Sequence, residues 1–483
     1  MTSDVPPTPG VPPTPGVPPT PGGVADGGLL APVWAGTRVE GVTSDHAWLR
    51  AMLEAEGALA RAQARAGLIP EEAAELIART AAGLVVDVGD LARRARDSAN
   101  PIVPLVSDLR EAVRNAAGSE SPAGDPARLV HLGATSQDIM DSAAMLVAMR
   151  AVAVIVADLD EAMRVLADLA RRHRDTPMAA RTLGQQAVPT TFGLKAAGWL
   201  MGLLRARDRL RALRLPAQLG GAAGTLAALT EHEALRHQGL APARPFAESA
   251  RPGIETASAA GESAALRVVS LYAEELGLAA PPVPWHAERS VVAELGSALA
   301  AAASALGKVA TDIVWLAQTE VGEVAESSKG GSSAMPHKRN PALSVLVRAA
   351  SLQVPAYASV LGAAGEHERA AGAWQAEWLP LRECLRLTGG AAETTAELLA
   401  GLNVFPGRMR ANAELTGAML VSERLSVHYG RDAAERILRD EGPPEVPGEL
   451  LDPAGYLGAA PELVDRILTV YQSAAQQSKE DSR

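Results

Sequence analysis

Residues 295–316 read LGSALAAAASALGKVATDIVWL. Apolar residues recur in this stretch at alternating spacings of four and three, at Leu295, Leu299, Ala302, Leu306, Val309, Ile313 and Leu316. This unbroken heptad pattern is typical of a helix that buries one face along its whole length. Helical character extends over about 287–326, and a helix of ~38 residues would be ~57 Å long. Few compact domains bury such a helix, so we expect neighbours of similar length from the same chain or from other subunits.

The rest of the chain also favours helices. Residues 142–173 contain neither Gly nor Pro, and a further helix is predicted over 190–215, after Pro189. Aromatic residues make up only 3% of the 483 residues, whereas Ala, Leu and Arg, which are strong helix formers, dominate long stretches. A chain of this length is expected to form two or three domains. The fold class predicted is therefore all-α.

Both ends of the chain are expected to lie outside the packed core. Three copies of V-P-P-T-P-G occupy residues 5–22, and their Pro and Gly content excludes a helix or a central strand. We expect residues 1–24 to be a disordered tail, either passive or used to dock a partner. The polar residues 474–483 are expected to be a second disordered tail.

Charge and composition exclude several classes of protein. The formal net charge is −11 and no extended basic stripe is found, which argues against a nucleic-acid partner. The N-terminus lacks a basic segment followed by an apolar run, so no secretory signal is predicted. No apolar run of about 18 residues free of charge occurs, so no membrane span is predicted. The single cysteine, Cys384, cannot form an intramolecular disulfide. These features indicate a cytoplasmic protein.

The segment that follows the long helix has an unusual charge. Residues 327–341 read S-S-K-G-G-S-S-A-M-P-H-K-R-N-P, and their Gly and Pro residues predict a loop. Residues 327–365 contain no Asp or Glu but carry four cationic side chains, Lys329, Lys338, Arg339 and Arg348. In an acidic chain such a stretch is a candidate anion site, although a solvated surface loop would have the same composition.

Three segments carry a family resemblance. Residues 331–341, G-S-S-A-M-P-H-K-R-N-P, match the signature G-S-S-x-M-P-x-K-x-N-P of the fumarase/aspartase superfamily at every fixed position. Residues 131–141, H-L-G-A-T-S-Q-D-I-M-D, and residues 181–189, R-T-L-G-Q-Q-A-V-P, resemble its other two shared regions in the right order. The resemblance covers about residues 28–470.

The resemblance implies an architecture. The expected three-domain fold has an N-terminal helical domain at 25–138, a central long-helix bundle at 139–366 and a C-terminal helical domain at 367–473. It also implies a homotetramer in which each active site takes the three shared regions from three different subunits.

The resemblance further implies roles for individual residues. Superfamily members remove the proton α to a carboxylate and expel a group β to it. By motif position the catalytic serine is Ser332, and Lys338 is expected to stabilise the developing charge. Residues expected to bind a small polycarboxylate substrate are His131, Thr135, Ser136, Gln185, Arg289, Met335 and Asn340. For Arg289, in the segment P-W-H-A-E-R at 284–289, a salt bridge at a helix start is an equal alternative. With no metal-ligand cluster or phosphate-binding glycine motif, no metal and no cofactor are expected.

The second shared region indicates which of the superfamily's reactions the chain catalyses. In the adenylosuccinate and argininosuccinate lyases and the fumarases it usually reads R-T-H-x-Q, and the histidine serves a leaving group that must gain a proton. Leu183 occupies that position here and cannot transfer one. This fits a carboxylate leaving group, and residues 181–199 and 371–378 likewise resemble the 3-carboxy-cis,cis-muconate cycloisomerases. Those enzymes interconvert 3-carboxy-cis,cis-muconate and 4-carboxymuconolactone in protocatechuate breakdown, the β-ketoadipate pathway. The alternatives are an adenylosuccinate-lyase-like enzyme or a non-catalytic structural protein on the same scaffold, against which Ser332, Lys338 and Asn340 argue.

Overall fold

The computed structural model describes residues 28–117, 125–237, 263–327, 335, 338–439 and 446–480. These parts are almost entirely helical, with two small antiparallel pairs of strands. The N-terminal helices are α1 (Arg38–Val42), α2 (Asp45–Arg65), α3 (Glu71–Gly83), α4 (Val88–Arg94) and α5 (Ile102–Ala117), with the 3-10 turns Ala95–Asp97 and Pro126–Leu129. The middle of the chain forms α6 (Ser136–Arg172), β1 (Pro177–Thr182), β2 (Gln185–Thr191), α7 (Phe192–Arg211), α8 (Ala227–His237), α9 (Ala264–Leu276), α10 (Ser290–Leu316) and β3 (Val324–Glu326). The remaining elements are α11 (Ala342–Ala358), α12 (Ala373–Ala400), β4 (Leu402–Val404), α13 (Pro406–Ala413), α14 (Ser422–Tyr429), α15 (Arg431–Leu438), α16 (Gly448–Leu451) and α17 (Ala460–Glu480), with the 3-10 turns Gly417–Val421 and Pro453–Gly455.

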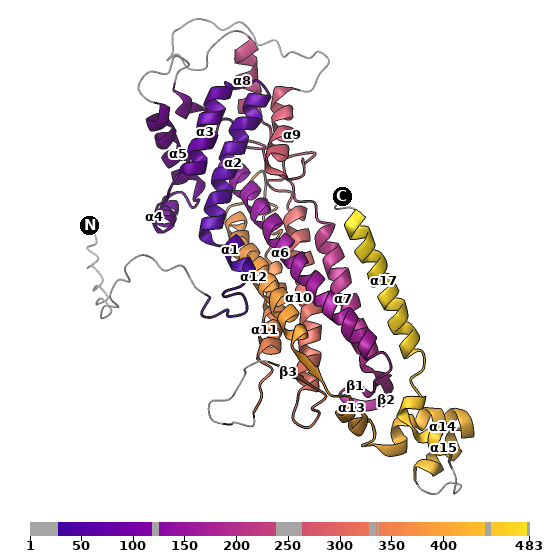
Figure 1. Cartoon of the computed structure of the whole chain (residues 1–483). Coiled ribbons are helices and arrows are strands. Elements are labelled where there is room, and N and C mark those ends of the chain that lie inside the picture. Colours follow the sequence, from indigo (N-terminus) through magenta and orange to yellow (C-terminus); the bar gives the residue numbers. More distant parts are fainter. Residues whose placement is uncertain are drawn as a thin grey trace, which may run out of the picture.

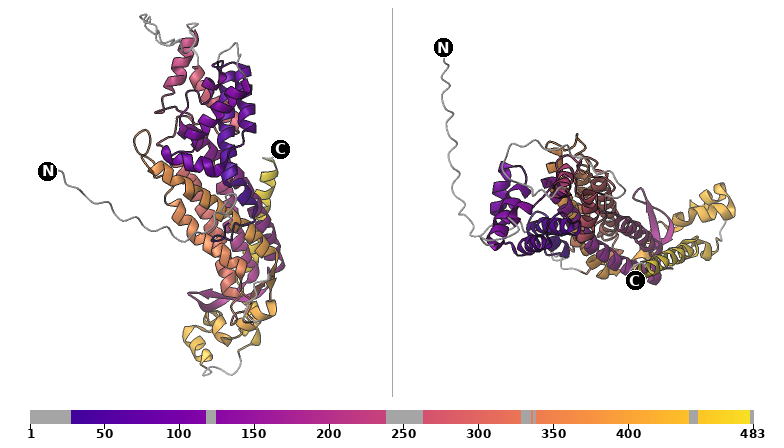
Figure 2. Two further views of the ribbon diagram at one scale, coloured as in Figure 1. Left: turned by 90° about the vertical axis from the view of Figure 1, so that its left-hand side faces the viewer. Right: turned by 90° about the horizontal axis from the view of Figure 1, so that it is seen from above.

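Five long helices form the middle of an elongated molecule. Figure 1 shows α6, α7, α10, α11 and α12 running side by side. The helices α2 to α5, with α8 and α9, lie beyond one end of this bundle, and the two strand pairs with α13 to α15 lie beyond the other. From there α17 returns alongside α7, as both views in Figure 2 confirm.

The predicted long helix is present but shorter than expected. α10 spans 27 residues and ends at Leu316, so it is ~40 Å long instead of ~57 Å. The chain turns after it because Gly322 takes a left-handed φ of 59° and its N–H donates to the carbonyl of Gln318. This turn brings the buried carboxylate of Glu323 to Arg181 and Asn412, where it forms bonds of 2.7 and 2.8 Å. A helix continuing to 326 would carry Glu323 away from both partners.

The apolar face of α10 is covered by its own chain. All seven heptad positions, from Leu295 to Leu316, are buried against α7, α11 and α12. The heptad pattern therefore reports packing inside one chain and is no evidence by itself for association. Exposed apolar side chains on this bundle include Trp315, Val345 and Leu352, none of them a heptad residue.

Within the described residues, two helices are long and apolar enough to cross a membrane by length and composition alone. They are α6 and α10, whose apolar windows are 67% and 50% buried inside the molecule. The core helices of a soluble bundle pass the same test, and the burial of α6 assigns its apolar surface to the protein interior.

Candidate active site

The first shared region forms the N-terminus of α6. Thr135 is the residue before the helix, and its N–H donates to the carboxylate of Asp138 at 2.9 Å. The same carboxylate accepts the N–H groups of Gly220 and Gly221 at 2.9 and 3.0 Å and contacts Nε2 of His286 at 2.7 Å. Asp138 is fully buried, so these four partners satisfy it. Its role is to clamp three separate segments around the start of the helix.

His131 is held in a strained conformation by a buried carboxylate. Its backbone φ is +63°, a left-handed value that is uncommon for a residue with a side chain. Its Nδ1 lies 2.6 Å from Oε1 of Glu56 on α2, a carboxylate that is almost fully buried. Burial lowers the pKa of His131, but the Glu56 carboxylate outweighs burial, so the pKa lies above its ordinary value. The pair favours an imidazolium, which suits an anionic ligand.

Arg369, which the sequence analysis missed, contacts this site. It belongs to the segment between α11 and α12, and its Nη2 donates to Oγ1 of Thr135 at 2.7 Å and to the carbonyl of Ala222 at 3.0 Å. A cation therefore lies at the positive end of the 37-residue helix α6. The charge of the 363–372 segment does not single out this arginine, because two glutamates precede it there.

Arg289 forms the salt bridge that the sequence left as the alternative to substrate binding. Its guanidinium binds Asp141 at 2.7 Å and Glu377 at 2.6 Å, and all three side chains are almost completely buried. The Asp141 carboxylate also accepts the indole N–H of Trp374 at 2.9 Å. Both carboxylates belong to the protein itself, so the contacts observed for Arg289 are those of the salt-bridge alternative.

The second shared region is a β-hairpin beyond the other end of α6. β1 and β2 pair antiparallel with Thr182 opposite Gln185, so Leu183 and Gly184 form a two-residue turn. Both turn residues have left-handed φ values, +50° and +80°. Leu183 is fully exposed and Gln185 is exposed as well. An apolar side chain is thus presented at the hairpin tip in a conformation that leucine does not favour.

The third shared region is described in part. Ser332 lies outside the described residues, as do 328–334 as a whole and 336–337. Met335 and Lys338 are exposed and Asn340 is half-buried, just before α11. Glu326 anchors this end of the segment, since its carboxylate accepts the N–H groups of Leu343 and Ser344 at 3.0 and 2.9 Å. Such a carboxylate stabilises a helix N-terminus.

One chain does not bring the shared regions together. Thr135 stands before the first residue of α6, and the hairpin of Leu183 follows the last residue of that helix. A helix of 37 residues is ~55 Å long, which separates the two regions by far more than a small substrate spans. In Figure 1 β3, the strand that leads into the third region, lies at the hairpin end. Among the described residues, His131, Thr135, Ser136 and Arg369 share one end of the bundle, whereas Leu183 and Gln185 lie at the other.

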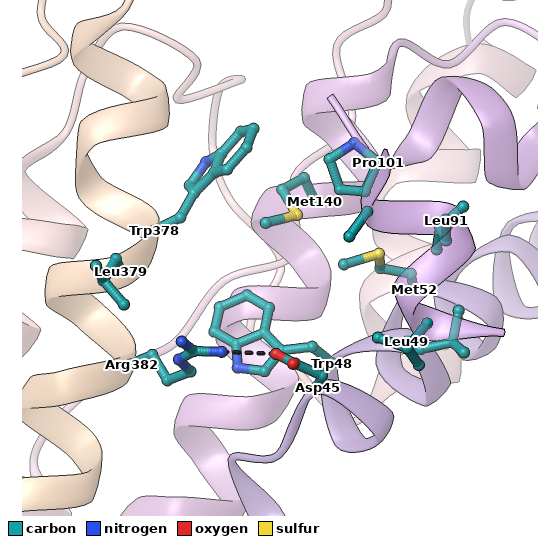
Figure 3. Close-up of a pocket in the computed structure, with 12 residues that line it drawn as sticks. Asp45, Trp48, Leu49, Met52, Leu91, Pro101, Met140, Trp378, Leu379 and Arg382 are labelled. Carbon is teal, nitrogen blue, oxygen red and sulfur yellow. Dashed lines mark hydrogen bonds and ion pairs between the residues drawn. The ribbon is translucent and has the colours of Figure 1, made fainter. Parts of the chain in front are cut away.

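A separate apolar cavity lies between the N-terminal helices and α12. It has a volume of about 290 Å³, and its walls include Trp48, Met140 and Trp378. Figure 3 shows the α12 side chains facing those of α2 and α6 across it, with the Arg382–Asp45 ion pair of 2.6 Å at its edge. None of the predicted site residues that the structure describes lines this cavity. In the parts of the chain that the structure describes, no group of three or more His, Cys, Asp or Glu side chains could hold a metal ion.

Fold and site together define an all-α enzyme whose first and second shared regions lie at the two ends of a long-helix bundle. The chain belongs to the lyase family of the fumarase/aspartase superfamily, because the family model described as lyase matches residues 36–242 and 247–356. This confirms the superfamily, the all-α fold class and the enzyme class predicted from the sequence.

Two curated relatives and one solved structure cover nearly the whole chain. The nitrosuccinate lyase of Streptomyces davaonensis is 50% identical over 480 residues, which cover 92% of this chain and 95% of that protein. The 3-carboxy-cis,cis-muconate cycloisomerase of Pseudomonas aeruginosa is 40% identical over 470 residues, covering 89% and 94%. The crystal structure of the 3-carboxy-cis,cis-muconate lactonizing enzyme from Pseudomonas putida matches with a TM-score of 0.79 at 34% identity, covering 93% of this chain and all of that one.

Proposed function

We propose that this enzyme eliminates nitrite from nitrosuccinate and forms fumarate. The supporting observation is Leu183, which puts a hydrocarbon where related lyases carry a proton donor. Nitrite is the conjugate base of nitrous acid, which is about as acidic as a carboxylic acid, so nitrite departs as an anion and needs no such donor. The 50% identity to a nitrosuccinate lyase over 92% of the chain supports the same choice.

The proposed elimination uses the predicted residues as follows. Ser332 removes a proton from the carbon α to one carboxylate, and the resulting dianion is stabilised by Lys338 and Asn340. The C–N bond then breaks, its electron pair leaves with nitrite, and the double bond of fumarate forms. Thr135, Ser136 and His131 hold the other carboxylate. Because Lys338 and Asn340 lie at the opposite end of the helix bundle from Thr135, Ser136 and His131, the complete site is assembled from several copies, which we propose to be a homotetramer.

The second candidate is the cycloisomerase predicted from the sequence. Its leaving group in the lactone-opening direction is a carboxylate, which Leu183 would suit equally. The likeness of residues 181–199 and 371–378 to cycloisomerases and the TM-score of 0.79 to a lactonizing enzyme support it. Identity, at 40% against 50%, favours the lyase.

The test compares three substrates on one purified protein. With nitrosuccinate, nitrite is measured by diazo coupling and fumarate by its ultraviolet absorbance, and the two should appear in equal amounts. With 3-carboxy-cis,cis-muconate, loss of the muconate chromophore is followed. Ser332→Ala serves as the control for uncatalysed loss of nitrite. Turnover of the muconate without nitrite release would establish the second candidate, and efficient cleavage of adenylosuccinate would refute the argument from Leu183.

A further inference from the structure

We infer that Arg369 binds a carboxylate of the substrate, the one on the carbon that bears the leaving group. This inference rests on the proposed function only in taking a di- or tricarboxylate as the substrate. Its basis is an unbalanced positive charge at the N-terminus of α6.

Arg369 has no carboxylate to neutralise it among the described residues. Its two hydrogen bonds go to uncharged oxygens, the hydroxyl of Thr135 and the carbonyl of Ala222. Its Nε is buried without a partner, and its Nη1 makes no hydrogen bond within the described residues. The nearby carboxylate of Asp138 is already satisfied by three backbone N–H groups and His286. The guanidinium is therefore oriented by its neighbours and electrostatically unpaired.

The location makes an unpaired cation costly without an anionic ligand. The first N–H groups of a helix have no partners inside the helix, and their summed dipole repels a cation. Arg369 nevertheless touches the residue just before α6, and His131, whose pKa is raised by Glu56, belongs to the same shared region four residues earlier. Arginine offers a planar fork that matches a carboxylate. One anionic group between Arg369 and the start of α6 would accept hydrogen bonds from the guanidinium and from the first backbone N–H groups of the helix.

In this proposal Arg369 contributes to binding of the substrate in the ground state and not to stabilisation of the dianion. Lys338 and Asn340 are assigned to the carboxylate that gains a second charge in the dianion. The carboxylate at Arg369 keeps a single charge throughout the reaction. A contact that is equally strong in the ground state and the transition state changes KM and leaves kcat nearly unaltered.

The experiment compares Arg369→Gln with Arg50→Gln. Arg50 is a matched control because its guanidinium, like that of Arg369, bonds only uncharged oxygens among the described residues, here the backbone carbonyls of Ala81 and Ala82. Kinetics are measured on whichever of nitrosuccinate and the muconate the wild-type protein turns over. Arg369→Gln should raise KM about tenfold to a hundredfold with kcat within about threefold, the loss expected for one charge-assisted hydrogen bond. Arg50→Gln should leave both constants unchanged.

A structural role would give a different pattern. Because Arg369 opposes the dipole of α6, its replacement should leave the melting temperature of the free protein equal or higher while affinity falls. If Arg369→Gln fails to fold, Arg369→Lys is used, which keeps the charge, loses the fork and should raise KM by a smaller factor. An unchanged KM, or a fall in kcat alone, would overturn the inference.

Failure of the proposed function is detected separately. If wild-type protein turns over neither substrate, calorimetry with fumarate and succinate replaces kinetics. Binding that Arg369→Gln weakens by the same factor upholds the carboxylate site, whereas equal binding by both proteins, or none by the wild type, overturns it.

Discussion

Arg289→Met should destabilise the protein strongly without removing a substrate contact. The guanidinium lies between Asp141 and Glu377, at 2.7 and 2.6 Å, and its side chain is 3% exposed. Methionine fills a similar volume but leaves two buried carboxylates without their cation. Removing one partner of a buried ion pair costs about 3–5 kcal/mol. The contact of Arg289 with the Trp285 ring, 4.9 Å from its centroid, is lost as well and adds to this cost.

The measurement is urea unfolding followed by far-ultraviolet circular dichroism at fixed chain concentration. The single variant should lose about 4 kcal/mol of unfolding free energy relative to wild type. Adding Asp141→Asn and Glu377→Gln removes the uncompensated charges and keeps acceptors for Trp374 and for the N–H of Gly362, so the triple variant should recover about half of the loss or more. A loss below about 1 kcal/mol combined with a KM raised tenfold or more would refute this reasoning and restore Arg289 as a substrate ligand.

Other predictions concern separate features. Ser332→Ala should lower turnover by several orders of magnitude with unchanged circular dichroism; turnover within about tenfold of wild type would remove Ser332 from catalysis. Leu183→His should lower activity, because in the proposed multi-chain site it adds a polar group that needs a partner, and should not by itself create adenylosuccinate cleavage, which direct assay of both reactions would show. Glu56→Gln should lower the pKa of His131, so activity that depends on the imidazolium should be lost at a lower pH than in wild type. Arg110 and Asp138 also act on that pKa, in opposite directions, and both remain in the variant. A raised pKa in the folded state stabilises the protein fully below the unfolded value and loses this contribution as pH rises through the folded value, so the wild type should show a loss of stability there that Glu56→Gln lacks. Light scattering should give about four chains per particle, and deleting residues 1–24 should change neither size nor activity; a stable, active monomer would contradict the shared site.

The sequence alone determined the features that depend on local order along the chain. Heptad spacing located the helix α10, the absence of Gly and Pro over 142–173 located most of α6, and the motif at 331–341 indicated the superfamily. These signals are local because helical periodicity and loop-forming residues act over a few positions. The same pattern left open whether the neighbours of this helix come from its own chain or from other subunits, because periodicity shows that a face is buried but not which chain covers it.

Only the tertiary structure decided which charged side chains meet. Thr135 and Arg369 are 234 residues apart in the chain, His131 and Glu56 are 75 apart, and Arg289 pairs with carboxylates 148 and 88 residues away. An arginine has the same appearance in sequence whether it is buried against two carboxylates or left unpaired at a helix N-terminus. The difference is set by long-range packing, which paired Arg289 with two buried carboxylates, placed Arg369 and Glu56 against the first shared region, and put the first and second shared regions at opposite ends of α6.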